Sequence, residues 1–271
     1  MKWRKREIQN LKIKMGQADE FLKLHHQQGL LLIGNCWDVT SAKVLQDAGF
    51  QAVATSSAAV ARSLGFEDGQ EIPFELLFET VGRIKKVLSI PFSVDLERGY
   101  DDGSADGVAR NIERLAEIGV VGVNLEDGLR EEVRILRPLA DFQNLIRTVN
   151  NTVNKNGLRV YINARTDGYL VNHPDAFAEA KMRVKAYEEA GAHGVFVPMA
   201  VNETEIAEIV RSVSLPVNVL ALPNLPSLKK LQELGVKRVS MGTWLHRKQQ
   251  AVLLETSNRV KSSGSLEGLF G

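Results

Sequence analysis

Short apolar runs alternate with longer amphipathic segments along most of the 271-residue chain. The short runs predict buried strands, and the longer segments predict helices. Eight strands are predicted, at residues 30–33, 52–55, 90–94, 120–125, 159–164, 194–197, 216–220 and 238–241. Helices are predicted between them, at residues 39–48, 74–88, 105–118, 139–153, 175–190, 203–210 and 227–234. This alternation favours a closed parallel (β/α)8 barrel of the TIM type over an open doubly wound sheet.

A chain of this length with 44% hydrophobic residues can bury one large core, so we expect a single barrel domain over residues 1–271. Two segments lie outside the barrel proper. Residues 1–15 form a basic N-terminal arm without the apolar segment of a secretory signal. Residues 243–271 comprise an extra helix, at 244–260, and a tail that contains Gly and Ser. Within the barrel, Asp38 is expected to cap the helix that follows the first strand.

Composition limits the possible partners. Lys and Arg number 34 against 33 Asp and Glu, and a net charge of +1 gives no electrostatic reason to bind nucleic acid or an anionic membrane. Cys36 is the only cysteine, which excludes an intramolecular disulfide and fits a reducing compartment. No run is long and apolar enough to span a bilayer. We therefore expect a cytoplasmic protein that acts on a small molecule.

Acidic residues follow two neighbouring strands at the point where each strand ends. Asp95 and Glu97 close the third strand, and Glu126 closes the fourth. Alternation along a strand would place Asp95 and Glu97 on the same side. Three carboxylates that converge on one rim repel one another unless a cation or protons neutralise them, and oxygen ligands favour Mg²⁺ or Mn²⁺. The alternative is that Asp95 and Glu97 pair with Arg98 and Arg165.

An arginine follows the fifth strand and would lie beside these acids. Arg165 can clamp a substrate carboxylate through two parallel hydrogen bonds. Equally, it can form a structural ion pair with Glu126 or Asp167. The residue pattern does not separate these two roles.

Polar residues at other strand ends complete the candidate site. Thr55, Ser56 and Ser57 offer hydroxyl and N–H groups suited to a carboxylate, although an ordinary polar loop has the same composition. Asp68 precedes a glycine, a pattern that a plain turn also explains. Asn124 either orients a carboxylate or satisfies backbone groups.

Two absences narrow the chemistry. No lysine stands at any of the eight strand ends, so a Schiff-base mechanism lacks an amine and a metal-dependent mechanism is preferred. The ends of the seventh and eighth strands lack the glycine-rich cradle that binds phosphate in many barrels, which disfavours a phosphorylated substrate.

Six motifs in register resemble the isocitrate lyase/phosphoenolpyruvate mutase superfamily. They are Ser41-Ala42, Thr55-Ser56-Ser57, Glu67-Asp68-Gly69, residues 94–100 (VDLERGY), residues 123–127 (VNLED) and residues 163–167 (NARTD). The resemblance spans residues 22–245. It implies a barrel whose displaced final helix is exchanged between subunits of a homo-oligomer, a tetramer or a dimer.

The resemblance also implies roles for individual residues. Mg²⁺ would bind an α-oxo carboxylate, held partly through waters by Asp95, Glu97 and Glu126. Ser56 and Ser57 would hold the carboxylate and oxo groups, with Thr55 and Asn124 also in the substrate site. Asp68 would lie near the water shell of the metal and Arg165 would contact the substrate, so we assign both to the catalytic site.

The sequence departs from the family where a proton donor is expected. The lyases carry a mobile Lys-Lys-Cys-Gly-His loop after the fourth strand, whereas residues 127–138 contain neither Cys nor His. The Lys and Asn of the mutase are missing from this segment too. Pro198 or Met199 replaces the mutase histidine after the sixth strand. Of the loop residues, Arg130, Glu131 and Glu132 are interpreted as solvated.

The leading hypothesis is an Mg²⁺-dependent lyase that makes or breaks a C–C bond in a small 2-oxo or 2-hydroxy di- or tricarboxylate through a metal-stabilised enolate. Methylisocitrate-like cleavage and oxaloacetate decarboxylation are its two forms. The first alternative is C–P chemistry, as in a phosphoenolpyruvate mutase or a phosphonopyruvate hydrolase. The second is a non-catalytic protein that binds oxo acids.

Overall fold

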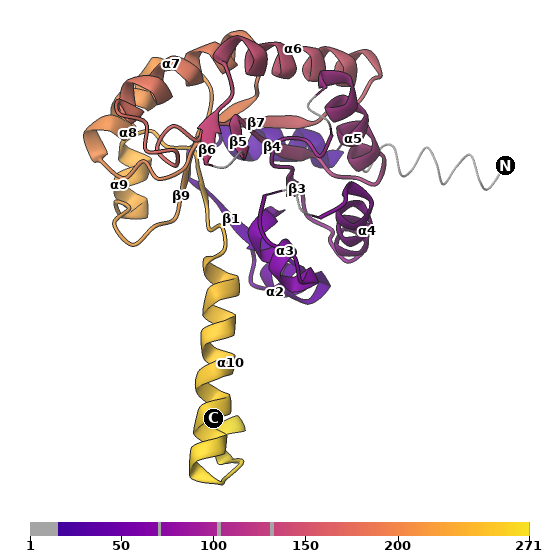
Figure 1. The fold of residues 1–271 in the computed structure, drawn as a ribbon, viewed down its shortest axis with the longest axis vertical. Coiled ribbons are helices and arrows are strands. Elements are labelled where there is room, and N and C mark those ends of the chain that lie inside the picture. Colours follow the sequence, from indigo (N-terminus) through magenta and orange to yellow (C-terminus); the bar gives the residue numbers. More distant parts are fainter. Residues whose placement is uncertain (1–15, 70–71, 102–103, 131–132, 271) are drawn as a thin grey trace, which may run out of the picture.

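The computed structural model describes residues 16–69, 72–101, 104–130 and 133–270. Eight parallel strands close into a barrel in the order β1-β10-β9-β8-β7-β4-β3-β2, which confirms the predicted (β/α)8 fold (Figure 1). These strands are β1 (Leu31–Cys36), β2 (Val53–Thr55), β3 (Phe92–Asp95), β4 (Gly122–Glu126), β7 (Tyr161–Arg165), β8 (Gly194–Val197), β9 (Val217–Leu220) and β10 (Arg238–Ser240). The basic arm at residues 1–15 and the loop residues Glu131 and Glu132 lie outside the described residues.

Helices follow the barrel strands, and all but α3 lie close to the predicted positions. They are α2 (Val39–Asp47), α3 (Ser57–Leu64), α4 (Phe74–Lys85), α5 (Ala105–Glu117), α6 (Leu139–Lys155), α7 (Ala176–Glu189), α8 (Glu203–Ser212), α9 (Leu228–Glu233) and α10 (Trp244–Ser263). Residues 16–26 are also helical. The Asp38 carboxylate accepts a hydrogen bond from the Ser41 N–H at 2.7 Å, so Asp38 caps α2 as predicted.

Two of the elements that were not predicted from the sequence border the carboxyl end of the barrel. Helix α3 occupies part of the segment interpreted as a loop after β2, and it ends at Gly65, whose φ of 83° glycine adopts without strain. The second element is an antiparallel hairpin of β5 (Gly128–Arg130) and β6 (Arg134–Leu136), directly after β4. Both elements shape the site described below.

The amino end of the barrel is closed by the helix of residues 16–26. Phe21 and Leu24 from this helix join a buried cluster with Leu31 of β1 and Tyr161 of β7. The His25 ring stacks on the Tyr161 ring, with centroids 4.0 Å apart. This packing covers the amino end of the barrel core.

Helix α10 projects away from the barrel in Figure 1. Its Leu253 and Leu254 side chains are 62% and 63% exposed, although both are apolar. The 3₁₀ turn Glu267–Leu269 packs against the far end of α10. None of the helices that the structure describes is long and apolar enough to cross a membrane.

Candidate functional site

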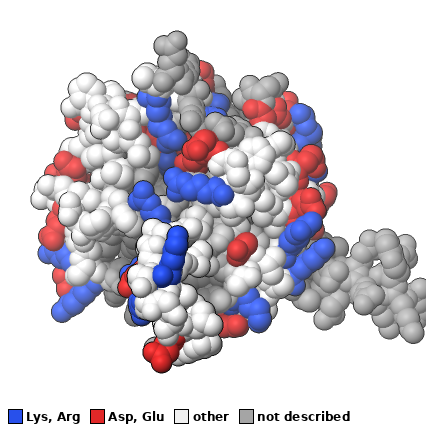
Figure 2. Space-filling view, turned by 60° about the horizontal axis from the view of Figure 1, so that its bottom comes forward, with Lys and Arg blue, Asp and Glu red and all other residues white. Residues whose placement is uncertain are grey.

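A pocket of about 350 Å³ lies at the carboxyl end of the barrel. Figure 2 is turned to bring forward the side from which α10 projects, and basic and acidic side chains lie next to one another near the middle of this face. Six of the predicted site residues line the pocket, namely Ser56, Ser57, Asp68, Asp95, Asn124 and Arg165. Thr55, Glu97 and Glu126 lie behind its wall and are buried. The pocket also contains Asn35 and three arginines that the sequence did not indicate, namely Arg62, Arg134 and Arg247.

Asp95, the last residue of β3, is held by the two hydroxyl residues of the neighbouring strand end. Ser57 Oγ donates to Asp95 Oδ2 at 2.9 Å, and the Asp95 N–H donates to Thr55 Oγ1 at 2.8 Å. Thr55 and Ser57 therefore support a carboxylate of the protein itself. Asp95 Oδ1 is buried and has no hydrogen-bond partner among the described residues, so it is an acceptor that the described protein groups leave unsatisfied.

Ser56 remains available to a ligand. It precedes α3 as the N-cap, but its hydroxyl makes no capping hydrogen bond. Its N–H donates to the Cys36 carbonyl at 3.0 Å, which fixes the backbone at the pocket wall. The Ser56 hydroxyl can therefore donate to a carboxylate in the pocket.

Glu97 does not share a strand face with Asp95, because β3 ends at Asp95 and Glu97 has a left-handed φ of 49°. The Glu97 carbonyl accepts from the Glu126 N–H at 2.8 Å, and the Tyr100 hydroxyl donates to the Glu97 carboxylate at 2.5 Å. Burial raises the pKa of Glu97 to about 7, and the charges of Asp95 and Asp68 contribute in the same direction. Glu97 thus belongs to the acidic cluster through a turn and not through strand alternation.

Arg165 forms the structural ion pairs that the sequence left as one of two alternatives. Its Nη1 lies 2.8 Å from Glu126 Oε2, and its Nε lies 2.7 Å from Asp167 Oδ1. Arg134 of the β5–β6 hairpin adds a second guanidinium, 2.5 Å from Asp167 and 4.0 Å from Glu126. Burial raises the pKa of Glu126 to about 8 despite the opposing charge of Arg165. Two arginines that line the pocket and two buried carboxylates therefore form one charge cluster.

The three predicted metal ligands are oriented toward different partners. Asp95 contacts Ser57, Glu97 contacts Tyr100, and Glu126 contacts Arg165. Within the described ranges, no group of three or more His, Cys, Asp or Glu side chains is arranged to hold a metal. A direct three-carboxylate cage is therefore not formed. The buried free oxygen of Asp95 still fits a cation, and the high pKa values of Glu97 and Glu126 indicate carboxylates that a nearby cation would stabilise as anions.

Asn124 presents an amide to the pocket in a fixed orientation. Its Oδ1 accepts from Asn163 Nδ2 at 2.9 Å and from Arg238 Nη2 at 3.5 Å. Because arginine only donates hydrogen bonds, the Asn124 atom facing it is the oxygen, and Nδ2 is left for the pocket. The sequence reasoning did not identify Arg238, although a charged residue within an apolar strand segment was an available signal.

Asp127 follows Glu126 but serves a structural purpose. It accepts hydrogen bonds from the Tyr187 hydroxyl, from Arg183 Nη1 at 3.0 Å and from the Asp167 N–H at 2.8 Å. Its carbonyl accepts from the Arg137 N–H at 2.8 Å, just after β6. Asp127 therefore anchors the hairpin that carries Arg134.

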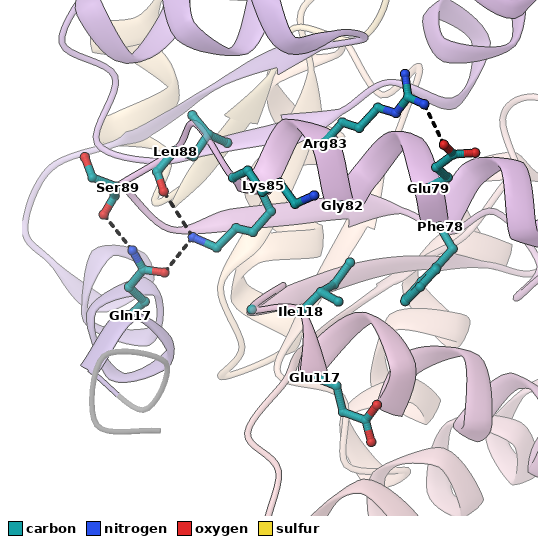
Figure 3. A pocket seen from close by; sticks show the side chains of 12 residues that line it. Gln17, Phe78, Glu79, Gly82, Arg83, Lys85, Leu88, Ser89, Glu117 and Ile118 are labelled. Atoms are coloured by element: carbon teal, nitrogen blue, oxygen red, sulfur yellow. Dashed lines mark hydrogen bonds and ion pairs between the residues drawn. The ribbon is translucent and has the colours of Figure 1, made fainter. Parts of the chain in front are cut away.

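A larger pocket, of about 850 Å³, lies between α4, α5 and the helix of residues 16–26 (Figure 3). Its polar side chains bond to their own neighbours: Lys85 donates to Gln17 at 2.8 Å, Gln17 donates to the Ser89 carbonyl at 2.6 Å, and Arg83 pairs with Glu79. Ser89 precedes β3, so this pocket lies at the amino end of the barrel, away from the end where catalysis occurs in this fold. We therefore place the candidate site in the smaller pocket.

The chain is similar in sequence and structure to several known proteins. An uncharacterized protein of Mycobacterium tuberculosis is 34% identical over 224 residues, which cover 82% of this chain and 81% of that protein. An oxaloacetate decarboxylase of Pseudomonas entomophila is 28% identical over 228 residues, which cover 79% of this chain and 76% of that enzyme. A crystal structure from Burkholderia cenocepacia, of a protein provisionally assigned as a phosphonomutase, has a TM-score of 0.84 at 33% identity and covers 89% of this chain and 99% of that one.

A family model described as phosphoenolpyruvate phosphomutase matches residues 21–261, nearly the whole barrel and most of α10. This range includes every strand of the barrel and all the residues assigned to the site. The chain belongs to the isocitrate lyase/phosphoenolpyruvate mutase superfamily.

Proposed function

We propose that this protein is a divalent-metal-dependent enzyme that breaks a C–C bond in a small 2-oxo or 2-hydroxy di- or tricarboxylate to give an enolate. Decarboxylation of an oxaloacetate-like acid is the form we favour, and methylisocitrate-like cleavage of a 2-hydroxy acid is the second form. The superfamily consists of lyases and mutases, and one relative is an oxaloacetate decarboxylase. One observation carries the proposal. Asp95, with an unpartnered oxygen, the Asn124 amide and Arg165 of the charge cluster all line one pocket.

Members of the superfamily use a divalent metal ion, and we propose Mg²⁺ here, with Mn²⁺ as a substitute. Asp95 would hold the ion directly through Oδ1, and Glu97 and Glu126 would accept hydrogen bonds from its waters. When bound, the ion supplies Lewis-acid polarisation of the substrate oxo and carboxylate oxygens.

The residues of the chain bind and orient the acid. Ser56 Oγ and Asn124 Nδ2 donate to the carboxylate next to the oxo group. Arg134 and Arg165 add positive charge along one wall, although Glu126 and Asp167 offset part of it. Asp68 lines the pocket, and burial raises its pKa, so it can accept a hydrogen bond from metal-bound water or hold a proton near the substrate.

The acid–base content of the pocket favours decarboxylation. Among the described residues that line it, no Lys, His, Cys or Tyr side chain occurs. Asp68, whose pKa burial raises, is a single group, whereas cleavage of a 2-hydroxy acid needs both a base for the hydroxyl proton and a separate acid for the enolate carbon. Decarboxylation needs neither group at the bond that breaks: the electron pair of the C–CO₂ bond passes into the oxo-acid enolate, which then takes a proton from water.

Proton NMR of the protein with Mg²⁺ and either oxaloacetate or 2-methylisocitrate tests the proposal. We expect pyruvate from oxaloacetate above the spontaneous rate, and loss of this excess in Asp95→Asn, which removes the charge but keeps the shape. Glu255→Gln, an exposed change on α10, is the matched control and should keep the full rate. Pyruvate from 2-methylisocitrate would assign the second form. Binding without turnover would identify an oxo-acid binding protein, and absence of binding would refute the proposal.

C–P chemistry is the alternative that one observation favours, namely the likeness to the Burkholderia cenocepacia protein assigned as a phosphonomutase. Phosphorus NMR with phosphonopyruvate tests it directly. Phosphate or phosphoenolpyruvate as product would replace decarboxylation as the leading reaction. We expect neither product, because the mutase Lys and Asn are absent from residues 127–138 and the mutase His is absent after the sixth barrel strand.

A further inference from the structure

Two arginines in the pocket differ from the two in the charge cluster. Arg62 comes from the last turn of α3 and Arg247 from the first turn of α10, and both line the same pocket as Asp95. Neither forms an ion pair with a carboxylate in the part of the chain that the structure describes, and both side chains are exposed. By contrast, Arg134 and Arg165 each contact two carboxylates.

The first turn of α10 is fastened to the rim of the barrel, so Arg247 is held at the pocket. Trp244 Nε1 donates to the Ala221 carbonyl at 2.6 Å, and the His246 ring packs edge-on against Trp37 with centroids 4.9 Å apart. The Arg247 guanidinium lies over the Trp244 ring, 5.3 Å from its centroid. The aromatic contact restricts the arginine without neutralising it.

The residues before α10 are tied to the rim as well. Asn35 Oδ1 accepts from the N–H groups of Met241 and Gly242 at 2.8 and 2.9 Å. The charge of Arg62 is one of the causes, after burial, that lower the pKa of His246, which places the end of α3 within electrostatic reach of this turn. The two arginines therefore belong to the same part of the rim.

The strand order places this part of the rim across the barrel from the charge cluster. Strand β1 lies between β10 and β2, which lead into α10 and α3, and it is four strands away from β7 in either direction. Strand β7 carries Arg165. A ligand held beside Asp95 and Asn124 can therefore extend away from the charge cluster, toward Arg62 and Arg247.

We propose that Arg62 and Arg247 form a second subsite, which binds the anionic group at the far end of the substrate, a carboxylate or a phosphonate. This inference rests on the proposed function, because the 2-oxo carboxylate defines the near end. A volume of about 350 Å³ lies within the range of small-molecule pockets, roughly 300–1,000 Å³, and exceeds the needs of a three-carbon acid. Two unpaired guanidinium groups across the pocket supply the charge that a second anion requires.

Binding of a matched pair of acids tests the subsite. 2-Oxoglutarate and 2-oxopentanoate have the same carbon chain and differ only in a terminal carboxylate or methyl group. With Mg²⁺ and the full-length protein, we expect calorimetry to show at least tenfold tighter binding of 2-oxoglutarate. Arg62→Gln and Arg247→Gln should each weaken 2-oxoglutarate binding by about fivefold to tenfold, because exposed charge pairs are partly screened, and should leave 2-oxopentanoate binding unchanged.

Controls separate the subsite from general effects. Arg259→Gln removes an exposed arginine from the same helix, far from the pocket, and should leave both affinities unchanged. Unfolding midpoints of all variants should match the wild type, since these side chains are exposed. A parallel comparison of phosphonopyruvate with pyruvate identifies the anion. If the double variant loses the preference for 2-oxoglutarate, the subsite binds a carboxylate, and if it loses the preference for phosphonopyruvate, the subsite binds a phosphonate.

Three results would overturn the inference. Equal wild-type affinity for the two five-carbon acids would show that no second anion is recognised. If the double variant Arg62→Gln/Arg247→Gln still prefers 2-oxoglutarate to 2-oxopentanoate, the arginines do not bind the second anion. Arg62 would then only interact with the carboxyl end of α3, and Arg247 would only stack on Trp244. In both cases the oxo-acid site itself would stand, whereas a wild-type protein that binds neither acid would remove the proposed function together with the subsite.

Discussion

Replacing the buried arginine of β10 should make the protein more stable and less able to bind its ligand. Arg238 is 1% exposed, and no carboxylate pairs with it within the described ranges. Its Nη1 has no hydrogen-bond partner there, while Nε donates to Ser240 Oγ at 3.2 Å and Nη2 to Asn124 Oδ1 at 3.5 Å. A buried cation with so few partners destabilises the folded state. Methionine has a similar length and no charge, so Arg238→Met removes this penalty.

The size of the effect follows from the shift in pKa. Burial lowers the pKa of Arg238 from 12.5 to about 10, and at 1.36 kcal/mol per unit the charged form costs about 3 kcal/mol. Loss of the two hydrogen bonds offsets about 1–2 kcal/mol of that, and the longer one contributes less. We therefore expect the free energy of unfolding to rise by about 1–2 kcal/mol, which corresponds to roughly 2–8 °C in Tm.

Ligand binding should change in the opposite direction. Without Arg238, only Asn163 orients the Asn124 amide, and we expect affinity for a 2-oxo acid to fall about tenfold. Urea titration with an unchanged m value measures the first effect and calorimetry the second. Arg238→Lys, which keeps a buried charge, should not be stabilised. If Arg238→Met is less stable than the wild type, or binds the acid with unchanged affinity, then Arg238 does not orient Asn124 at a cost in stability.

Three further predictions address parts of the molecule outside the pocket. Burial, followed by the charge of Arg238, lowers the pKa of His25 to about 3, so the unfolded state gains a proton below pH 6.5 while the folded state stays neutral. The contribution of His25 to the free energy of unfolding should therefore be complete above pH 6.5, and the free energy of unfolding should be about 2 kcal/mol lower at pH 5. Urea titrations of His25→Phe should show a smaller decrease between these two pH values. Tyr187→Phe removes one of the three donors to buried Asp127 and should lower the urea-derived free energy of unfolding by about 1–3 kcal/mol; an unchanged midpoint would contradict this. If α10 joins subunits, Leu253→Glu with Leu254→Glu should give monomers in light scattering, and an unchanged mass would count against that role.

The fold was predictable because local signals and the global arrangement agree. Apolar runs mark all eight barrel strands, and Asp38 caps the helix that its position indicated. Helix α3 was missed because Ser57–Leu64 is short and rich in Ala and Ser, although Gly65 was an available end signal. The β5–β6 hairpin was missed because its strands have three residues each, too few for alternation to be recognised.

The site was predictable in its position and less so in its contacts. Strand ends correctly placed Asp95, Asn124 and Arg165 at one pocket, because parallel strands present their carboxyl ends together. The left-handed turn at Glu97 could not be anticipated, since a non-glycine residue at positive φ gives no sequence signal. The choice of Arg165 between substrate and protein carboxylates depends on distances that only the folded chain defines. Arg62 and Arg247 are 185 positions apart and meet only through closure of the barrel.

The β5–β6 hairpin after β4 replaces the loop that carries Cys and His in the lyases. Of the differences from the family, this one most affects which reaction the site can catalyse. Where the lyases carry a loop with Cys and His, this chain places Arg134, anchored on Asp167 and close to Glu126. An arginine in a protein does not release its proton, so Arg134 can stabilise negative charge but cannot protonate a carbon. A site built in this way assists a step that develops charge on the substrate and leaves protonation to water. Decarboxylation is such a step, whereas cleavage of a 2-hydroxy acid needs the proton transfers that the missing loop would supply. The replacement of an acid by a fixed cation therefore connects the altered hairpin to the proposed reaction.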